Sequence, residues 1–408
     1  SRGKSGWSEL FKDEGRCDLL DTALANKIDM QSSLLLVERA QASLRSARLS
    51  YVPAFDFSPN ASYSSVSRAW DVSLPVNASW EIDIFGNILN AKRGKKAALL
   101  QSEAYEQAVR SQLIAAVAST YYSLLALDAQ YEIYQETERS WRENVEVTRS
   151  LMEAGRANAA SLAQTEANYY NVCNGLIDIR QQIRQTENQL CSLLGWPSSH
   201  VERGTLADWT GPEVISTGVP LKVLSKRPDV RQAEQALAEA FYATNAARSA
   251  FYPRITISGG AAYNLTNMIY SAVGSLVQPI FQRGTLKANF DIAKSQEAAA
   301  ALAFRQAIID AGIEVNDAFV AVHSAREKAD NYASQVERLE EAVRSTQLLM
   351  TYGSTTYLEV LTAQQTLLNA QIGAVTNRLS EISGVITLYQ ALGGGSEAEA
   401  DTEMTVEE

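Results

Sequence analysis

The chain has too few cysteine and histidine residues for a disulfide framework or a metal cluster. Its 408 residues include three cysteines, at positions 17, 173 and 191, and two histidines, at positions 200 and 323. No pair among them has the short spacing of a zinc or redox motif. Because no nucleophile–base set or nucleotide-binding loop occurs either, we expect a non-enzymatic protein with no metal and no cofactor.

Long apolar runs and an excess of positive charge are also missing. No run of 18 apolar residues occurs, so the sequence predicts no transmembrane helix. The net charge is −11 and no basic stripe stands out, which argues against a nucleic-acid partner. The first ten residues, "SRGKSGWSEL", are not typical of a signal peptide, so we expect a mature or trimmed form.

Proline is scarce, and its placement predicts long helices. The nine prolines leave residues 76–196 and 280–408 without any, and a proline-free stretch permits an uninterrupted helix. From about 87 to 154, and from about 285 to 352, only Gly94 and Gly312 interrupt good helix formers. At 1.5 Å per residue, each stretch predicts a helix of roughly 100 Å, far longer than helices of globular proteins.

The clearest positive pattern is strict alternation of apolar and polar residues in "DVSLPVNASWEIDI" at 71–84. Fourteen alternating residues exceed the usual strand of about 5–6 and are enough to cross a bilayer with tilt. The segment "YVPAFDFSPNASY" at 51–63 alternates in the same way, and the polar loop "SSVSRAW" joins the two. Residues 51–84 therefore predict a β-hairpin with one apolar and one polar face.

A second hairpin follows two hundred residues later. "ITISGGAAYNL" at 255–265 alternates, and "SAVGSLVQPIF" at 271–281 supplies its partner. Four strands are too few to close a barrel, and an open sheet with an apolar face is prone to aggregate. Closure therefore requires further copies of the chain.

The two halves of the chain are an internal duplication. Each long helix breaks at a glycine, Gly155 or Gly353, and each returning helix ends at another, Gly195 or Gly393; both pairs are 198 residues apart. We expect a mixed α and β membrane protein in which each half is a β-hairpin followed by a helical hairpin. The predicted segments are an N-terminal helical region (1–50), first β-hairpin (51–86), first helical hairpin (87–195), connector and helix (196–250), second β-hairpin (251–283), second helical hairpin (284–393) and acidic disordered tail (394–408).

With these features the chain resembles the TolC family of trimeric outer-membrane channels, in its lipoprotein branch serving multidrug efflux pumps. The shared phrases occur in family order and cover roughly residues 7–395: "WEIDIFGN", "SKRPDVRQAE", "ARSAFYPRITISGGAA", "PIFQRGTLKAN", "YLEVLTAQ" and "LYQALGGG", with "LLGWP" after the first helical hairpin. The resemblance implies a homotrimer in which four strands per chain form a 12-stranded barrel in the Gram-negative outer membrane. The helices would continue as a hollow α-helical barrel across the periplasm.

The resemblance also implies partners: a periplasmic adaptor protein, an inner-membrane transporter of the RND or a similar type, and outer-membrane lipid. A lipid anchor would need an N-terminal cysteine upstream of Ser1, because Cys17 in "DEGRCDLL" lacks the apolar small-residue run of a lipidation site. Within the barrel, the apolar face of the strands would contact lipid and the polar face would line the lumen. The expected lipid-facing residues are Val72, Leu74, Val76, Trp80, Ile82, Ile255 and Ile257.

Two sites at the periplasmic end are carried over from the family. The helical turns would dock on the adaptor through Ala154, Gly155, Arg156, Tyr352, Gly353 and Ser354. The returning helix of the second half would narrow the pore at Leu358, Glu359, Thr362 and Gln365, of which the first, third and fourth share a helical stripe. Thr362 stands where family members commonly carry a second acid, so we expect a weaker acidic ring than in two-acid members.

Other interpretations remain open at this stage. A helical turn needs a left-handed residue whether or not it docks, and Glu359 could solvate an outer helix face. A soluble structural coiled-coil protein would account for the helices but not for the alternating strands, and an exit duct for type I secretion would share the architecture.

Overall fold

The computed structural model describes residues 14–66, 68–211, 224–264, 268–280, 282–352 and 357–394. The chain divides into two compact units. The helical unit takes in residues 1–31, 109–224 and 311–408, and the sheet unit takes in residues 32–108 and 225–310. The two longest helices, α4 (Asn87–Glu153) and α8 (Thr285–Thr351), each contribute to both units.

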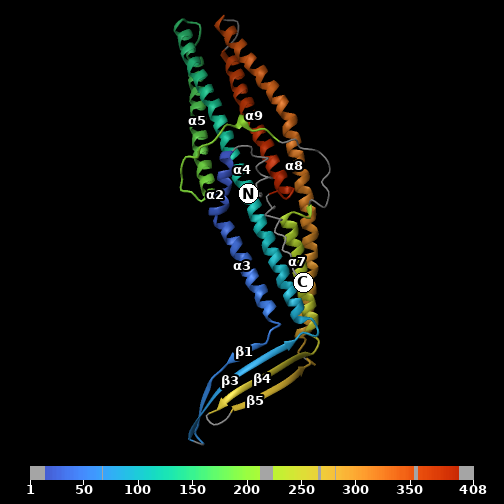
Figure 1. Cartoon of the computed structure of the whole chain (residues 1–408). Coiled ribbons are helices and arrows are strands. Elements are labelled where there is room, and N and C mark those ends of the chain that lie inside the picture. Colours follow the sequence, from blue (N-terminus) through green and yellow to red (C-terminus); the bar gives the residue numbers. More distant parts are fainter. Residues whose placement is uncertain are drawn as a thin grey trace. The chain divides into compact units, whose positions relative to one another are not determined.

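The sheet unit contains one antiparallel sheet (Figure 1). Its strand order is β1-β3-β4-β5, with β2 also paired to β3. The strands are β1 (Ala54–Phe57), β2 (Asn60–Ser64), β3 (Ala69–Ile82), β4 (Arg254–Asn264) and β5 (Met268–Val277).

The expected first strand is divided into two segments, β1 and β2. Ser58 and Pro59 separate them, and proline has no backbone N–H to donate to the ladder. The Ser58 N–H still donates to the Pro75 carbonyl at 3.3 Å, so the chain keeps its course beside β3. The described residues therefore form five strand segments instead of the four expected strands, because the first expected strand is divided into β1 and β2.

The register places the alternating apolar residues on one face of the sheet. Val76 pairs with Phe57 on one side and with Ala261 on the other, and Trp80 pairs with Ile257. Residues directly opposite each other in a ladder point to the same face. The pairing of β4 with β5 extends this face through Tyr270 opposite Ala261.

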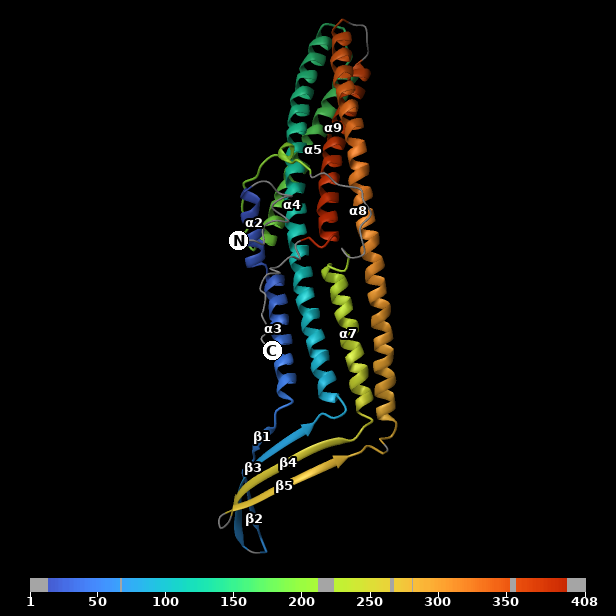
Figure 2. The ribbon, with the colours of Figure 1, turned by 45° about the vertical axis from the view of Figure 1, so that its right-hand side comes forward.

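Four helical segments of the sheet unit end at or begin from the sheet, as Figures 1 and 2 both show. The segments are α3 (Ile28–Leu49), the start of α4, α7 (Pro228–Ser249) and the start of α8. Pro228 fits the first turn of α7, where its missing N–H costs no hydrogen bond.

The helical unit contains α2 (Glu14–Asn26), α5 (Ala159–Leu194), a short 3-10 turn η1 (Leu206–Asp208), α9 (Tyr357–Ala391) and the remainders of α4 and α8. Its core is continuous from α4 through α5 to α9. Among the side chains that form it are Tyr122, Leu124, Leu190, Leu194 and Ile382, each at most 1% exposed. No described helix is long and apolar enough to cross a membrane.

The internal duplication is confirmed by the spacing of the elements. Helices α4 and α8 have 67 residues each, and α5 and α9 have 36 and 35. Gly86 and Gly284 both have positive φ before the long helices, and Gly195 and Gly393 both have positive φ after the returning helices. Each pair is separated by the same 198 residues.

Candidate channel wall and gating residues

The seven residues expected to face lipid all lie on the apolar face of the sheet. The ladders join Leu74 to Tyr263, Ile82 to Ile255 and Ala61 to Val72. None of the sheet side chains whose burial is described is buried; Val76, for example, is 47% exposed. A sheet of this size with both faces open has no core of its own among the residues that the structure describes.

The opposite face is polar on β1, β3 and most of β4 but not on β5. Asp56, Asn77 and Ser258 lie on it, and the Asn77 amide donates to the Asp56 carboxylate at 3.1 Å. On β5 this face instead carries Ile269, Val273 and Val277, alternating with serines. The alternation signal is weaker in β5 for that reason.

The sheet has two open edges within the part of the chain that is described. The β1–β2 edge and the β5 edge each have a strand neighbour on one side only. Backbone N–H and C=O groups left unpaired in hydrocarbon cost several kcal/mol each, so such edges need further strands in a membrane.

The N-terminal turns of α9 bring three of the four expected pore residues to one exposed face. Leu358 is 59% exposed, Thr362 is exposed and Gln365 is half-buried. The Thr362 hydroxyl donates to the Leu358 carbonyl at 2.9 Å, which keeps that side chain against its own helix. Glu359 is exposed one helical position away from the stripe.

The opposite face of α9 is fixed to α4 by a buried amide that the sequence analysis missed. Gln364 is 6% exposed and lies between Val360 and Leu368, which are also buried. Its side-chain oxygen accepts from Asn144 at 2.8 Å, and its side-chain nitrogen donates to Ser140 at 3.2 Å. This pair of bonds sets the rotation of α9 about its own axis, and so decides which side chains point away from the core.

The tyrosine that opens α9, Tyr357, lies near α5, although its buried hydroxyl has no hydrogen-bond partner among the described residues. Burial raises the pKa of the Tyr357 phenol, and the Thr165 hydroxyl of α5 partly offsets this rise. Thr165 is itself fully buried and donates to the Ser161 carbonyl at 2.8 Å. The start of α9 therefore contacts both helices of the first helical hairpin.

The turn between α4 and α5 is closed by a left-handed glycine. Gly155 has φ +70°, its N–H donates to the Met152 carbonyl, and the Arg156 N–H donates to the Leu151 carbonyl at 2.8 Å. This pair of bonds satisfies the last carbonyls of a helix. A Cβ at Gly155 would have nothing within 4 Å, so the backbone conformation alone requires glycine.

The expected docking residues of this turn are accessible. Ala154, Gly155 and Arg156 are exposed, as is Tyr352 at the end of α8. Gly353 and Ser354 lie outside the described residues. The α4–α5 turn and the α8–α9 end lie at the same end of the helical unit in both views (Figures 1 and 2).

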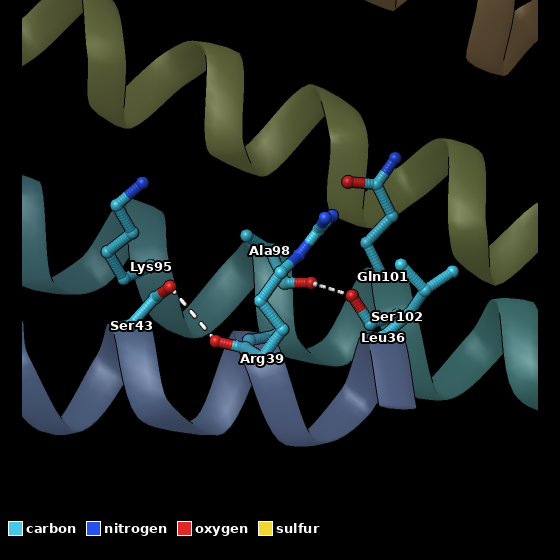
Figure 3. A pocket seen from close by; sticks show the side chains of 8 residues that line it. Leu36, Arg39, Ser43, Lys95, Ala98, Gln101 and Ser102 are labelled. Carbon is cyan, nitrogen blue, oxygen red and sulfur yellow. Dashed lines mark hydrogen bonds between the residues drawn. The ribbon is translucent and has the colours of Figure 1, made fainter. Parts of the chain in front are cut away.

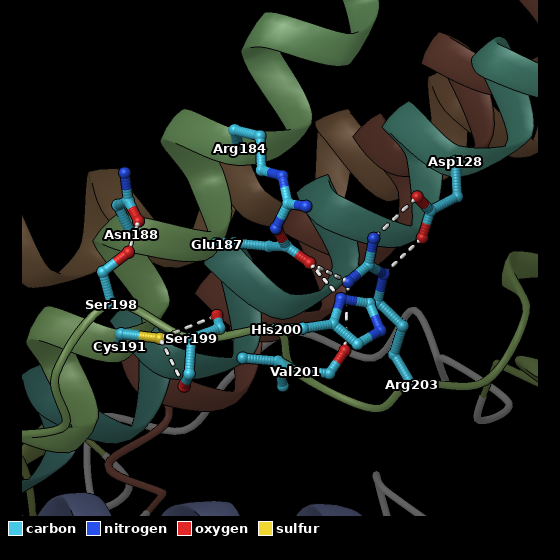
Figure 4. A network of polar contacts seen from close by, with 10 residues as sticks. All are labelled: Asp128, Arg184, Glu187, Asn188, Cys191, Ser198, Ser199, His200, Val201 and Arg203. Carbon is cyan, nitrogen blue, oxygen red and sulfur yellow. Dashed lines mark hydrogen bonds and ion pairs between the residues drawn. The ribbon is translucent and has the colours of Figure 1, made fainter.

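A network of ion pairs fixes the loop that follows α5 (Figure 4). Arg203 of this loop donates to Asp128 of α4 at 2.9 Å and to Glu187 of α5 at 2.6 Å. His200 contacts the same Glu187 carboxylate at 2.8 Å, and Arg184 contacts it at 3.0 Å. Burial raises the pKa of Glu187, but the hydrogen bonds from Arg203 and His200 outweigh this and lower it overall.

A similar network stabilises the second half. Glu381 of α9 is 5% exposed, accepts from Arg326 at 2.9 Å and from Arg378 at 2.8 Å. Arg378 also donates to the Trp209 carbonyl and lies over the Trp209 ring. The sequence analysis missed both networks, although the patterns "RQTE" (184–187) and "RLSE" (378–381) place an arginine one turn before each buried glutamate.

A shallow groove of about 330 Å³ lies between α3 and α4 (Figure 3). Its lining includes Leu36, Ala40 and Ala98, with the exposed cations Arg39 and Lys95. The serine hydroxyls in it donate to carbonyls of their own helices. None of its lining residues is buried, so the groove is open helix surface.

Comparison with known proteins identifies the family. The family model described as outer membrane efflux protein matches residues 19–196 and 219–394, one match for each half. The chain is 26% identical over 406 residues to the cation efflux system protein CusC of Escherichia coli K12, covering 96% of this chain and 89% of that protein. It is 27% identical over 421 residues to the toluene efflux pump outer membrane protein TtgC of Pseudomonas putida, covering 96% and 85%.

Solved structures of outer-membrane channels have the same fold as this chain. A crystal structure of CusC superposes with a TM-score of 0.90 at 25% identity and covers 96% of this chain and 94% of that one. The outer membrane protein VceC of Vibrio cholerae has the same fold, with a TM-score of 0.86 at 22% identity and coverage of 96% and 99%. The chain belongs to the outer membrane efflux protein family, and the expected fold class is confirmed.

Proposed function

We propose that this chain forms the outer-membrane exit duct of a tripartite efflux system, a passive trimeric channel for small toxic molecules. The observation that carries the proposal is the sheet: one face is apolar through every described strand, both faces are open, and both edges lack neighbours. Three copies would satisfy the edges, cover the lumen face and leave the apolar face to lipid.

The family relationship supports this assignment. CusC and TtgC carry names of cation and toluene efflux, and both are similar to this chain over nearly all of its length. Their different cargoes agree with a duct that does not select its cargo. In this proposal an inner-membrane transporter of the RND or a similar type selects the cargo, and a periplasmic adaptor joins it to the duct.

The adaptor would dock on the exposed turns at the far end of the helical hairpins. The Gly155 turn is capped by its own backbone hydrogen bonds, so Ala154 and Arg156 are free to contact a partner without unwinding the helix. Tyr352 is 78% exposed, an unusual position for a large aromatic side chain unless a partner covers it.

The pore would be narrowest at the first turns of α9. Leu358, Thr362 and the half-buried Gln365 form one helical stripe, and Gln364 fixes the helix rotation that directs this stripe away from the core. In a trimer, three Glu359 carboxylates would give a ring that attracts cations and repels anions.

The test is reconstitution of the purified chain in a planar bilayer. We expect discrete ion-conducting steps with cation selectivity, and no conductance from protein unfolded before addition. A protein that stays in solution without detergent and gives no conductance would contradict the proposal.

A further inference from the structure

Positive charge gathers where the four helical segments of the sheet unit meet the sheet. Residues 40–53, 83–96, 240–254 and 278–294 contain eleven Lys and Arg residues but only two acids, Asp83 and Asp291, whereas the whole chain has 36 Lys and Arg against 47 Asp and Glu. We call these eleven residues the basic collar: Arg45, Arg48, Lys92, Arg93, Lys95, Lys96, Arg248, Arg254, Arg283, Lys287 and Lys294.

The collar is a product of the fold, because its members come from four separated segments. The end of α3, the start of α4, the end of α7 and the start of α8 all lie next to the sheet in Figures 1 and 2. Each helical member lies within ten residues of the helix end nearest the sheet. At 1.5 Å per residue, this confines the charges to a layer about 15 Å deep.

The collar charges are not neutralised within the described part of the chain. Ten of the eleven side chains are exposed and Lys92 is half-buried, and none forms an ion pair with a described carboxylate. Lys92 and Arg93 instead approach the faces of Tyr51 and Tyr242. Lys287 lies in the first turn of α8, where the helix dipole disfavours a cation.

Exposed aromatic side chains occupy the same level. Phe85 and Tyr252 stack with ring centroids 4.9 Å apart, and each is more than 40% exposed. Trp80, near the end of β3, donates through its indole N–H to the Tyr51 carbonyl at 3.0 Å. Aromatic side chains in this position are typical of the boundary between the hydrocarbon and the headgroups of a membrane.

We infer that the basic collar binds the phosphate headgroups of anionic phospholipids in the leaflet next to the helices. This inference rests on the proposed function, which places the sheet in the bilayer. The apolar face ends at the aromatic residues, so the collar begins at the depth of the lipid phosphates. Cations at this depth are attracted to anionic lipid, and the attraction weakens with added salt.

The test uses the detergent-solubilised full-length assembly titrated with phosphatidylglycerol or phosphatidylcholine, with retained lipid counted by native mass spectrometry. One variant carries Lys92→Gln, Arg93→Gln, Lys95→Gln and Lys96→Gln. A second carries Arg283→Gln, Lys287→Gln and Lys294→Gln, whose exposed side chains do not lie over an aromatic ring of the described residues. The matched control removes four exposed charges elsewhere, by Arg139→Gln, Arg305→Gln, Lys328→Gln and Arg338→Gln.

We expect the unmodified protein and the control to retain phosphatidylglycerol in preference to phosphatidylcholine. Both collar variants should lose this preference, by about tenfold or more in lipid affinity for the four-residue variant. Equal retention by all four proteins would overturn the inference. So would collar variants that keep their lipid but change anion permeability, because the charges would then line the lumen. Protein that neither assembles nor conducts contradicts the proposed function, whereas a conducting assembly that ignores phosphatidylglycerol contradicts only the collar.

Discussion

A charge placed on the apolar face of β3 should weaken membrane assembly. Val76 lies at the middle of the fourteen residues of β3, between Phe57 and Ala261 on its two neighbours. With about 3.4 Å per residue and a tilt near 40°, Val76 is within about 2 Å of the bilayer midplane if the strand is centred. An arginine on the lipid face at that depth costs about 2–4 kcal/mol, once in each chain.

Ser79 supplies the matched control. It lies about 9 Å from the midplane by the same geometry, still within the apolar band, but it pairs with Ala54 and Ser258 on the polar face. We expect Val76→Arg to lower the free energy of unfolding in lipid vesicles by about 2–4 kcal/mol per chain. We expect Ser79→Arg to change it by less than about 1 kcal/mol. Urea titration followed by tryptophan fluorescence measures both. Equal losses, or a larger loss at Ser79, would refute the assigned facing.

Three further predictions concern the helical unit. Glu359→Gln should weaken cation selectivity in single-channel recordings while leaving assembly intact; unchanged selectivity would place the constriction elsewhere. Gln364→Leu removes the oxygen to which the half-buried Asn144 amide donates, so it should destabilise the start of α9 by about 1 kcal/mol and raise open probability, whereas an unchanged channel would show that this amide does not control the gate. Folding lowers the pKa of Glu187, so its carboxylate stabilises the folded protein at pH values above the usual pKa of a glutamate. This stabilisation is lost as the pH falls through the lowered pKa of the folded state. Acidification below about pH 5 should therefore destabilise the unmodified protein more than the Glu187→Gln variant, and parallel losses in thermal melts would contradict this.

The sequence predicts the fold class because its strongest patterns are local. Period-2 alternation over 71–84 and two proline-free stretches specify strands and long helices without knowledge of tertiary contacts. Pro59 shows where a local pattern fails to predict the structure. The alternation of apolar and polar residues continues through Pro59, but the strand pairing is interrupted there. On β5, the face that is polar on β3 carries Ile269, Val273 and Val277, alternating with two serines. This arrangement could not be predicted from the sequence, because β5 has no regular alternation of polar and apolar residues that would show which of its faces lines a lumen.

The sites were less predictable, because their residues meet only in the folded chain. Leu358 and Thr362 could be placed on one helical stripe from spacing, but Gln364 is one of four glutamines in α9, and only its buried contact with Asn144 distinguishes it. The basic collar escaped the sequence analysis for the same reason. Its cations are spread over four segments of a chain with net charge −11, and no single segment contains more than four of them.

The most direct test of the central claim is the mass of the detergent-solubilised particle, measured together with its β content. The claim is that one chain of 44.6 kDa cannot close its sheet and that three chains do. Sedimentation and far-ultraviolet circular dichroism should give a single species with the protein mass of three chains and the full strand content. A monodisperse monomer that retains the full strand content would contradict the claim.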